Sequence, residues 1–268
     1  MTTATGTWHG RLNRTGQAAQ QWLAEWWQLA LLGAMLLVLS LSPSSYSRAS
    51  RVQLSHHVYT STMPVLLGFS VLCALASVVL TRIVLITALS YGLSQYALQV
   101  VIRVLVLELI PLSAALFVAL RCTIPDGAEL TALQASGALD AMRQRGVEPI
   151  RHEVLPRVVA GMFSGISLAA LSSAVALVVA YVVAYGFAAS GLASYTRLFG
   201  QVFTPAVSLI FVLKTLFFCL AVSLIPMASA LYGMRGTSLR ASAEMRGLVR
   251  MFAVILLIEV ASLVGNYY

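Results

Sequence analysis

Three ionisable residues stand inside otherwise apolar stretches of the sequence. Glu108 lies in the run 104–120, Lys214 lies in 202–230, and Glu259 lies nearer the end of the last run, where it could reach an interface. A charge near the middle of a bilayer costs on the order of 2.5–3.5 kcal/mol, so each side chain needs water, a partner or a polar ligand. Glu108 and Lys214 could therefore form a structural salt bridge, or they could form a polar site in a cavity, where Lys214 could bind a phosphate.

Two further residues are expected to border that cavity. Pro111 stands three residues after Glu108, and a proline inside a helix removes a backbone hydrogen bond and bends the helix. Tyr91 follows the preceding apolar run, at the end where a path through the cavity would open. We therefore predict one site that contains Glu108, Lys214, Pro111 and Tyr91.

The composition indicates that these charges belong to a membrane protein. Of 268 residues, 59% are hydrophobic and 10% are charged, whereas soluble domains carry roughly 25% charged residues. The length suits an all-α protein with about five or six spans of roughly 20 residues. The nine acidic residues are too few for a carboxylate-rich metal or hydrolase site. The basic residues are spread between apolar runs, which argues against nucleic-acid binding.

Motifs for other chemistry do not occur in the sequence. Cys73, Cys122 and Cys219 form no CxxC pair and are expected to be small core residues. The histidines lack the HExxH spacing of a zinc site, and no GxxxxGK[ST] phosphate loop is found. We predict no catalytic residue, no metal and no cofactor, so any ATP hydrolysis must belong to another chain.

The apolar runs and the arginines between them predict the topology. Five runs are long enough to cross a bilayer, at 63–89, 97–120, 158–189, 202–232 and 249–264. Arginines crowd the connections 121–157 and 235–250, whereas 90–96 and 190–201 hold a single arginine. Because arginine-rich loops stay in the cytoplasm, the first two connections are predicted inside and the other two outside, with Tyr268 periplasmic.

The N-terminal segment 1–57 is predicted to be a cytoplasmic tail followed by an interfacial helix. The run 22–41 combines a tryptophan belt with Glu25, which is typical of a helix that lies in a membrane interface. A sixth span here would leave the basic residues of the tail outside. Residues 58–268 then form the transmembrane domain.

The connection 121–157 contains a predicted short helix at 127–145. Asp126 and Glu129 have the spacing of a capping box, and Gly146 is a typical helix stop. We expect this helix to lie across the cytoplasmic face. The pattern alone leaves open whether it is an ordinary loop helix or a coupling helix that docks on a cytoplasmic partner.

Several segments follow the motifs of one membrane-protein family. ELIP at 108–111 and GVEPI at 146–150 resemble the family's RELGPV and GVDPI motifs, and LKT at 213–215 resembles its IKSxVF motif. Tyr91 falls where the family often has a tyrosine. The family is that of the MlaE/YrbE-type permeases, the membrane subunits of MCE-associated ABC transporters, and the likeness covers roughly residues 57–268.

The resemblance implies a dimeric, multi-pass permease of the bacterial inner membrane with five transmembrane helices, an N-terminal interfacial helix and a coupling helix. It implies a cytoplasmic ABC ATPase, a second permease subunit and a periplasmic MCE-domain protein as partners, with (phospho)lipid as the substrate moved between inner and outer membranes. It also implies that the coupling helix contacts the ATPase, for which we single out Glu129, Ala138, Leu139, Met142 and Arg143.

The sequence departs from the family pattern at two informative places. Leu107 stands where the family has an arginine before the glutamate, and Gly137-Ala138 stands where the coupling helix has EQ. The second departure is consistent with altered coupling, or with pairing to a different and better-matched permease.

Two other classes of membrane protein remain as alternatives. Asp126-Gly127, Gly137 and Asp140 are similar to a CDP-alcohol phosphotransferase signature, but that lipid-metabolism chemistry needs more aspartates to hold divalent metals. A secondary transporter would show inverted repeats or paired broken helices, and the sequence shows neither. A permease should co-purify with an ATPase and an MCE protein, whereas an enzyme or carrier should purify alone.

Overall fold

The computed structural model describes residues 24, 26–36, 38–39, 48–232 and 240–267, and within these ranges the ordered elements are all helical. From residue 48 onward they are α2 (Arg48–Ser90), α3 (Ser94–Val101), η2 (Ile102–Leu109), α4 (Ile110–Val118), η3 (Ala119–Thr123), α5 (Ile124–Ala135), α6 (Ala138–Gln144), η4 (Ile150–Val154), α7 (Leu155–Tyr185), η5 (Ala189–Gly191), α8 (Leu192–Val202), α9 (Pro205–Tyr232) and α10 (Arg240–Tyr267).

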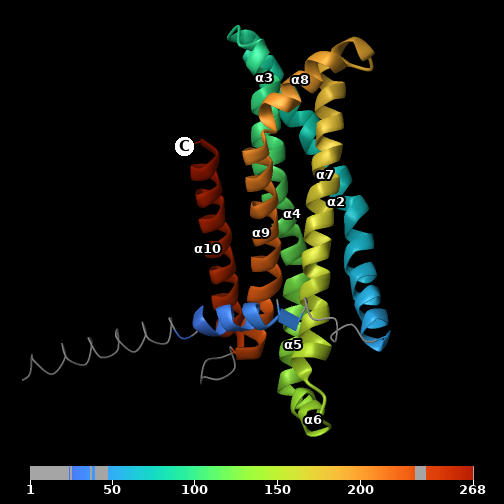
Figure 1. Cartoon of the computed structure of the whole chain (residues 1–268), viewed down its shortest axis with the longest axis vertical. Helices are drawn as coiled ribbons and strands as arrows, with labels where there is room; N and C mark the ends of the chain where they lie inside the picture. The colour runs from blue at the N-terminus through green and yellow to red at the C-terminus, as the bar shows by residue number, and fades with distance from the viewer. Residues whose placement is uncertain (1–23, 25, 37, 40–47, 233–239, 268) are drawn as a thin grey trace, which may run out of the picture.

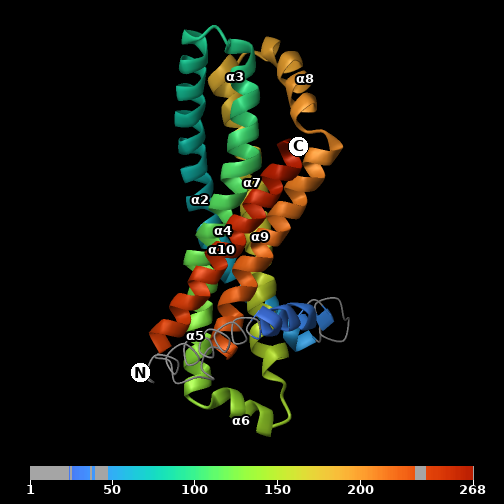
Figure 2. The same ribbon diagram turned by 90° about the vertical axis from the view of Figure 1, so that its left-hand side faces the viewer.

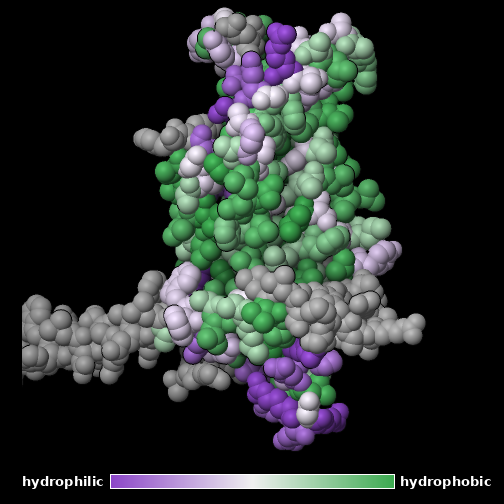
Figure 3. All heavy atoms as spheres, in the orientation of Figure 1, coloured by the Kyte–Doolittle hydropathy of each residue, from purple (hydrophilic) through white to green (hydrophobic). Residues whose placement is uncertain are grey.

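Five helical stretches are long and apolar enough to cross a membrane. They are Thr62–Ser90, Tyr96–Ala135, Ile150–Tyr185, Pro205–Tyr232 and Met245–Asn266. They run side by side, with α6 at one end of the bundle and α8 at the other (Figures 1 and 2). Apolar side chains cover the middle of the face seen in Figure 3, and hydrophilic residues gather at its two ends. The predicted all-α, five-span membrane fold is confirmed.

Aromatic and small residues together form the packed centre of the bundle. Phe69 of α2 and Phe117 of α4 pack with ring centroids 5.0 Å apart, and the fully buried Phe218 of α9 lies in the same cluster. Gly161 and Gly165 let α7 approach α9 closely, because a Cβ at these positions would meet the Ser223 and Cys219 side chains of α9 at 2.7 and 2.6 Å. Close contact at small residues is how helices pack in membranes, where apolar burial gives little driving force.

Three π-helical segments interrupt the long helices, and each ends two residues before a proline. η2, η3 and η4 precede Pro111, Pro125 and Pro156 respectively. A proline has no N–H for the carbonyl four residues earlier, and its ring crowds that carbonyl. A widened turn relieves this conflict without ending the helix, and such turns are frequent at functional sites. Where the sequence predicted a bend at Pro111, the structure has a π-helical segment that contains Glu108.

The apolar helix Trp26–Leu36 lies across the long helices, near the end of the bundle that carries α6 (blue in Figures 1 and 2). Leu32 and Leu36 are buried against Leu155 and Val158 of α7. This geometry agrees with the predicted interfacial helix. The tail before it lies outside the described residues.

The prediction of a single helix at 127–145 is wrong, because the structure has two helices there, α5 and α6. The first of them, α5, prolongs the span formed by α3, η2, α4 and η3, and Asp126 lies within this continuous helix instead of capping a new one. The chain then breaks at Gly137, which adopts a left-handed conformation with φ of 75°, and α6 turns across the end of the bundle (Figure 2). Glycine adopts this conformation readily. The predicted stop at Gly146 is confirmed, also with φ of 75°.

At the opposite end, α8 folds back onto α7 through three tyrosines. The Tyr195 hydroxyl donates a hydrogen bond of 2.8 Å to the Leu177 carbonyl, and its ring packs edge-on against Tyr181, with centroids 5.3 Å apart. Burial, with a smaller contribution from Tyr185, raises the pKa of Tyr195 to about 12. The hydroxyl therefore remains a donor at any physiological pH, which keeps α8 attached.

Candidate functional site: a charged cluster between three spans

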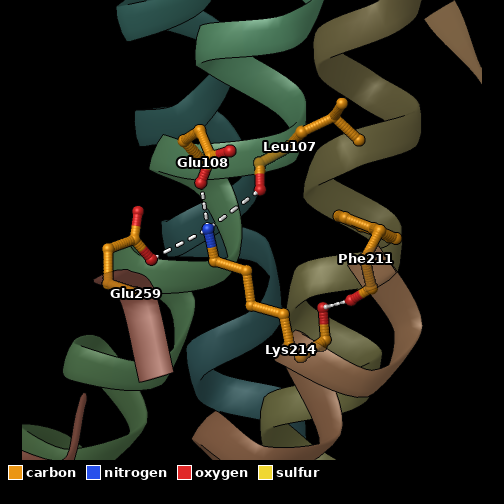
Figure 4. Close-up of polar contacts among 6 residues, drawn as sticks. Leu107, Glu108, Phe211, Lys214 and Glu259 are labelled. Atoms are coloured by element: carbon orange, nitrogen blue, oxygen red, sulfur yellow. Dashed lines mark hydrogen bonds and ion pairs between the residues drawn. The ribbon is translucent and has the colours of Figure 1, made fainter. Parts of the chain in front are cut away.

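Lys214 is at the centre of a charged cluster formed by three different spans (Figure 4). Its Nζ pairs with Glu108 Oε2 from η2, lies 2.8 Å from Glu259 Oε2 of α10, and donates a 3.3 Å hydrogen bond to the Leu107 carbonyl. The structure thus brings together Glu108 and Lys214, which the sequence singled out as a pair.

The π segment explains why the Leu107 carbonyl is available to Lys214. Pro111 lies four residues after Leu107 and has no N–H to donate to that carbonyl. A buried carbonyl without a partner is costly, and the Lys214 ammonium supplies the missing donor. Pro111 itself is buried in α4. It therefore shapes the cluster through the backbone.

Burial differs sharply among the three charged side chains. Lys214 is 2% exposed, whereas Glu108 and Glu259 are 12% and 19% exposed. The face of the Phe218 ring also lies 5.7 Å from the ammonium, at a distance where a cation and an aromatic ring attract each other. A group that approaches the cluster therefore meets the carboxylates before it meets the lysine.

Glu259 is the residue that sequence reasoning left out of the site. It does lie nearer one end of its span, Met245–Asn266, but its carboxylate contacts Lys214 instead of reaching toward an interface. The carboxylates of Glu259 and Glu108 also interact with each other. The available signal was its charge within an apolar run, which resembles the setting of Glu108 and Lys214.

Tyr91 is not part of this cluster. It lies in the turn between α2 and α3 and is 76% exposed. Glu108 follows the start of α3 by fourteen residues along a helical path, or about 20 Å. The structure therefore places Tyr91 at the end of the bundle that carries α8, apart from the charged residues.

No group of three His, Cys, Asp or Glu side chains suited to a metal occurs in the described ranges.

A second polar cluster joins α5 to the start of α7. The guanidinium of Arg157, 4% exposed, donates a 2.7 Å hydrogen bond to Glu153 Oε2 and lies 3.4 Å from Glu129 Oε1. α5 is also tied to α9, since Gln134 Nε2 donates to the Leu231 carbonyl at 3.3 Å. Any force applied to α5 would therefore reach both α7 and α9.

The residues predicted to contact an ATPase differ in their accessibility. Leu139 is 3% exposed and packs in the core with Met142 beside it, so both hold α6 to the rest of the chain. Ala138 is half-buried. Glu129 and Arg143 are exposed, and Arg143 pairs with Asp140 at 3.0 Å. A partner at this end would meet mainly the charged side chains.

Five apolar spans around a charged cluster define a multi-pass membrane protein of the transport type. The model of the family Permease MlaE matches residues 54–264, so the chain belongs to the MlaE permease family and is an ABC-type lipid permease. A search of curated proteins finds no match. Members of this family are transporter membrane subunits, which excludes the membrane-enzyme and secondary-transporter alternatives.

Proposed function

We propose that this chain is the permease subunit of a complex that moves phospholipid between the inner and outer membranes of a bacterium. A cytoplasmic ABC ATPase powers the complex, and a periplasmic MCE-domain protein exchanges lipid with it. A second permease subunit, identical or related, completes the membrane part. The chain itself hydrolyses no ATP.

The observation that carries this proposal is the Lys214 cluster inside a chain of the MlaE permease family. Three ionisable side chains between spans are expensive to insert. If these side chains only linked the helices, apolar packing would do so at a lower cost in free energy. A site that handles the polar end of a lipid gives these charges a use.

The proposal also assigns the two ends of the bundle. Exposed Arg121, Arg143 and Arg145 gather at the end with α5 and α6, which the positive-inside rule places in the cytoplasm, beside the ATPase. The end with α8 and Tyr91 then faces the periplasm and the MCE protein. Tyr91 would lie where lipid passes between the permease and that partner.

Co-purification followed by reconstitution tests the proposal. The tagged permease, expressed with its cognate ATPase and MCE protein, is expected to retain both. In proteoliposomes, the complex should move fluorescent phospholipid to acceptor vesicles only with ATP. An ATPase variant that binds but does not hydrolyse ATP serves as the control. Purification of the permease alone, or transfer that is independent of ATP, would contradict the proposal.

A further inference from the structure

Pro226 interrupts the hydrogen-bond ladder of α9. A proline has no N–H, so the carbonyl of Val222, four residues earlier, has no donor within its own helix. Val222 is fully buried, and a buried carbonyl without a partner is costly. The hydroxyl of Thr123, from η3, donates a 2.9 Å hydrogen bond to this carbonyl. A side chain of another span therefore supplies the donor that α9 lacks.

Thr123 uses its hydroxyl differently from two neighbouring buried threonines. Thr131 of α5 and Thr215 of α9 each donate to the carbonyl four residues earlier in their own helix, which is a common bond of a helical threonine. Thr123 is 1% exposed and donates across to α9 instead. Its hydroxyl therefore joins two spans at the turn of α9 that the proline weakens.

Beyond this bond, α5 stays in contact with the end of α9. A Cβ at Gly127 would lie 3.3 Å from the Cβ and the carbonyl oxygen of Pro226, so the absence of a side chain there lets α5 approach α9 closely. Further along, Gln134 Nε2 donates to the Leu231 carbonyl at 3.3 Å. The contacts at Gly127 and Gln134 therefore hold α5 along the end of α9.

The position of each contact relative to the proline determines which part of α9 it can move. Gln134 holds α9 beyond Pro226, and a helix that is loaded there bends at the turn where a proline has removed a hydrogen bond. Val222 lies before that turn, about two helical turns from Lys214 on the same helix. The Thr123 bond therefore attaches α5 to the part of α9 that carries the charged cluster.

We propose that Thr123 is a positioning residue that couples α5 to the part of α9 that carries Lys214, across the break at Pro226. The inference rests on the transport function proposed above, in which an ATPase acts on the α6 end, and it adds the joint through which that motion reaches the charged cluster. With the hydroxyl in place, α5 and α9 move together. Without it, α9 bends at Pro226, and ATP is hydrolysed without moving the cluster.

The ratio of lipid transferred to ATP hydrolysed tests this role. The permease, in its complex with the ATPase and the MCE protein, is reconstituted in proteoliposomes with fluorescent phospholipid, and both rates are measured on the same sample. Thr123→Val keeps the shape of the side chain but removes the donor. We expect its ratio to fall about fivefold, a typical coupling factor between two sites, while the rate of ATP hydrolysis stays unchanged.

Two further substitutions separate coupling from packing. Pro226→Ala gives α9 a backbone N–H that can donate to the Val222 carbonyl, so Thr123→Val combined with Pro226→Ala should regain the wild-type ratio. Thr131→Val is the matched control, because it removes a buried hydroxyl that bonds within α5, and it should keep the wild-type ratio. Thermal unfolding measures the stability of every variant.

The joint and the transport function fail in different ways. If the wild-type complex moves no lipid with ATP, the transport function fails. If it does move lipid, the joint alone is overturned by a wild-type ratio in folded Thr123→Val, by an equal loss in Thr131→Val, or by no recovery with Pro226→Ala. A hydrogen bond that only stabilises the fold would lower the unfolding temperature and leave the ratio unchanged.

A comparison in the Pro226→Ala background decides the question if Thr123→Val alone does not fold. The break in α9 is repaired in that background, so the joint is no longer needed. Pro226→Ala with and without Thr123→Val should then give equal ratios of lipid transferred to ATP hydrolysed. Unequal ratios would show that the hydroxyl acts in some other way, and would overturn the proposal.

Discussion

At the scale of single residues, Lys214 and its two carboxylates form one energetic unit. Each glutamate is acceptable between spans because the ammonium compensates part of its charge. Exchanging the residues at positions 108 and 214 for each other would be an ambiguous test of a headgroup site, because Lys214 also contacts Glu259. After such an exchange the carboxylate at position 214 would face Glu259, so a loss of function would not by itself reveal a headgroup site.

The first prediction concerns removal of the cation. Lys214→Met, which keeps the length of the side chain, should destabilise the protein by about 3–5 kcal/mol, because it leaves two buried carboxylates without their partner. Adding Glu108→Gln and Glu259→Gln should recover most of this loss. Thermal unfolding of the variants in one detergent measures the effect. Losses that simply add in the triple variant would show that the three side chains do not act together.

At the scale of helices, close approach at glycines holds the spans together. Gly161 of α7 lies where η3 and α9 meet, and a Cβ there would be 2.8 Å from Thr123 Cγ2 and 2.7 Å from Ser223 Oγ. Both side chains are buried, so they have little room to move. The junction connects α7 to the segment that leads into α5.

The second prediction tests this junction. Gly161→Ala should destabilise the protein by about 1–3 kcal/mol, the usual cost of overpacking. Gly68→Ala is the matched control, since nothing lies within 4 Å of a Cβ at that position in α2. It should be neutral or stabilise the helix by up to about 1 kcal/mol. Equal unfolding temperatures for the two variants would contradict the packing argument.

The third prediction concerns the exposed charges of α6. Arg143→Glu should weaken ATPase binding about tenfold, equivalent to about 1.4 kcal/mol, while leaving the fold intact, because exposed ion pairs such as Arg143–Asp140 contribute little to stability. Arg197→Glu in α8 makes the same charge change at the opposite end and should have no effect. ATPase pull-down and stimulation measure the difference. Unchanged binding in Arg143→Glu would place the dock elsewhere.

The break before α6 shows where sequence reasoning reached its limit. The spacing of apolar residues correctly predicted helix on both sides of Gly137, and Leu139 and Met142 do pack inward. The same glycine can continue a helix or end one, and the choice depends on tertiary contacts such as those that fix α5 to α9. The signal for the break was therefore present but ambiguous.

At the scale of the whole molecule, the five spans could be predicted because apolar length alone identifies them. Their mutual orientation could not. The spans carry apolar side chains on nearly all faces, so no periodic stripe shows which face of α10 turns toward α9. The ion pair between Glu259 and Lys214 depends on how α10 is rotated about its own axis. Only the folded structure reveals that rotation.

The last prediction fixes the direction of the bundle in the membrane. Ser194 in α8 and Gln144 in α6 are both exposed and lie at opposite ends of the bundle (Figure 1). Ser194→Cys should react with a membrane-impermeant maleimide in intact cells, whereas Gln144→Cys should react only after permeabilisation, because the arginines at its end keep that end in the cytoplasm.

The native Cys73, Cys122 and Cys219 are buried and give a low background in the parent protein. Tyr268, predicted to be periplasmic, lies outside the described residues, and a cysteine there should behave as at Ser194. Labelling of Gln144→Cys from outside would reverse the proposed orientation, and with it the assignment of the ATPase to the α6 end.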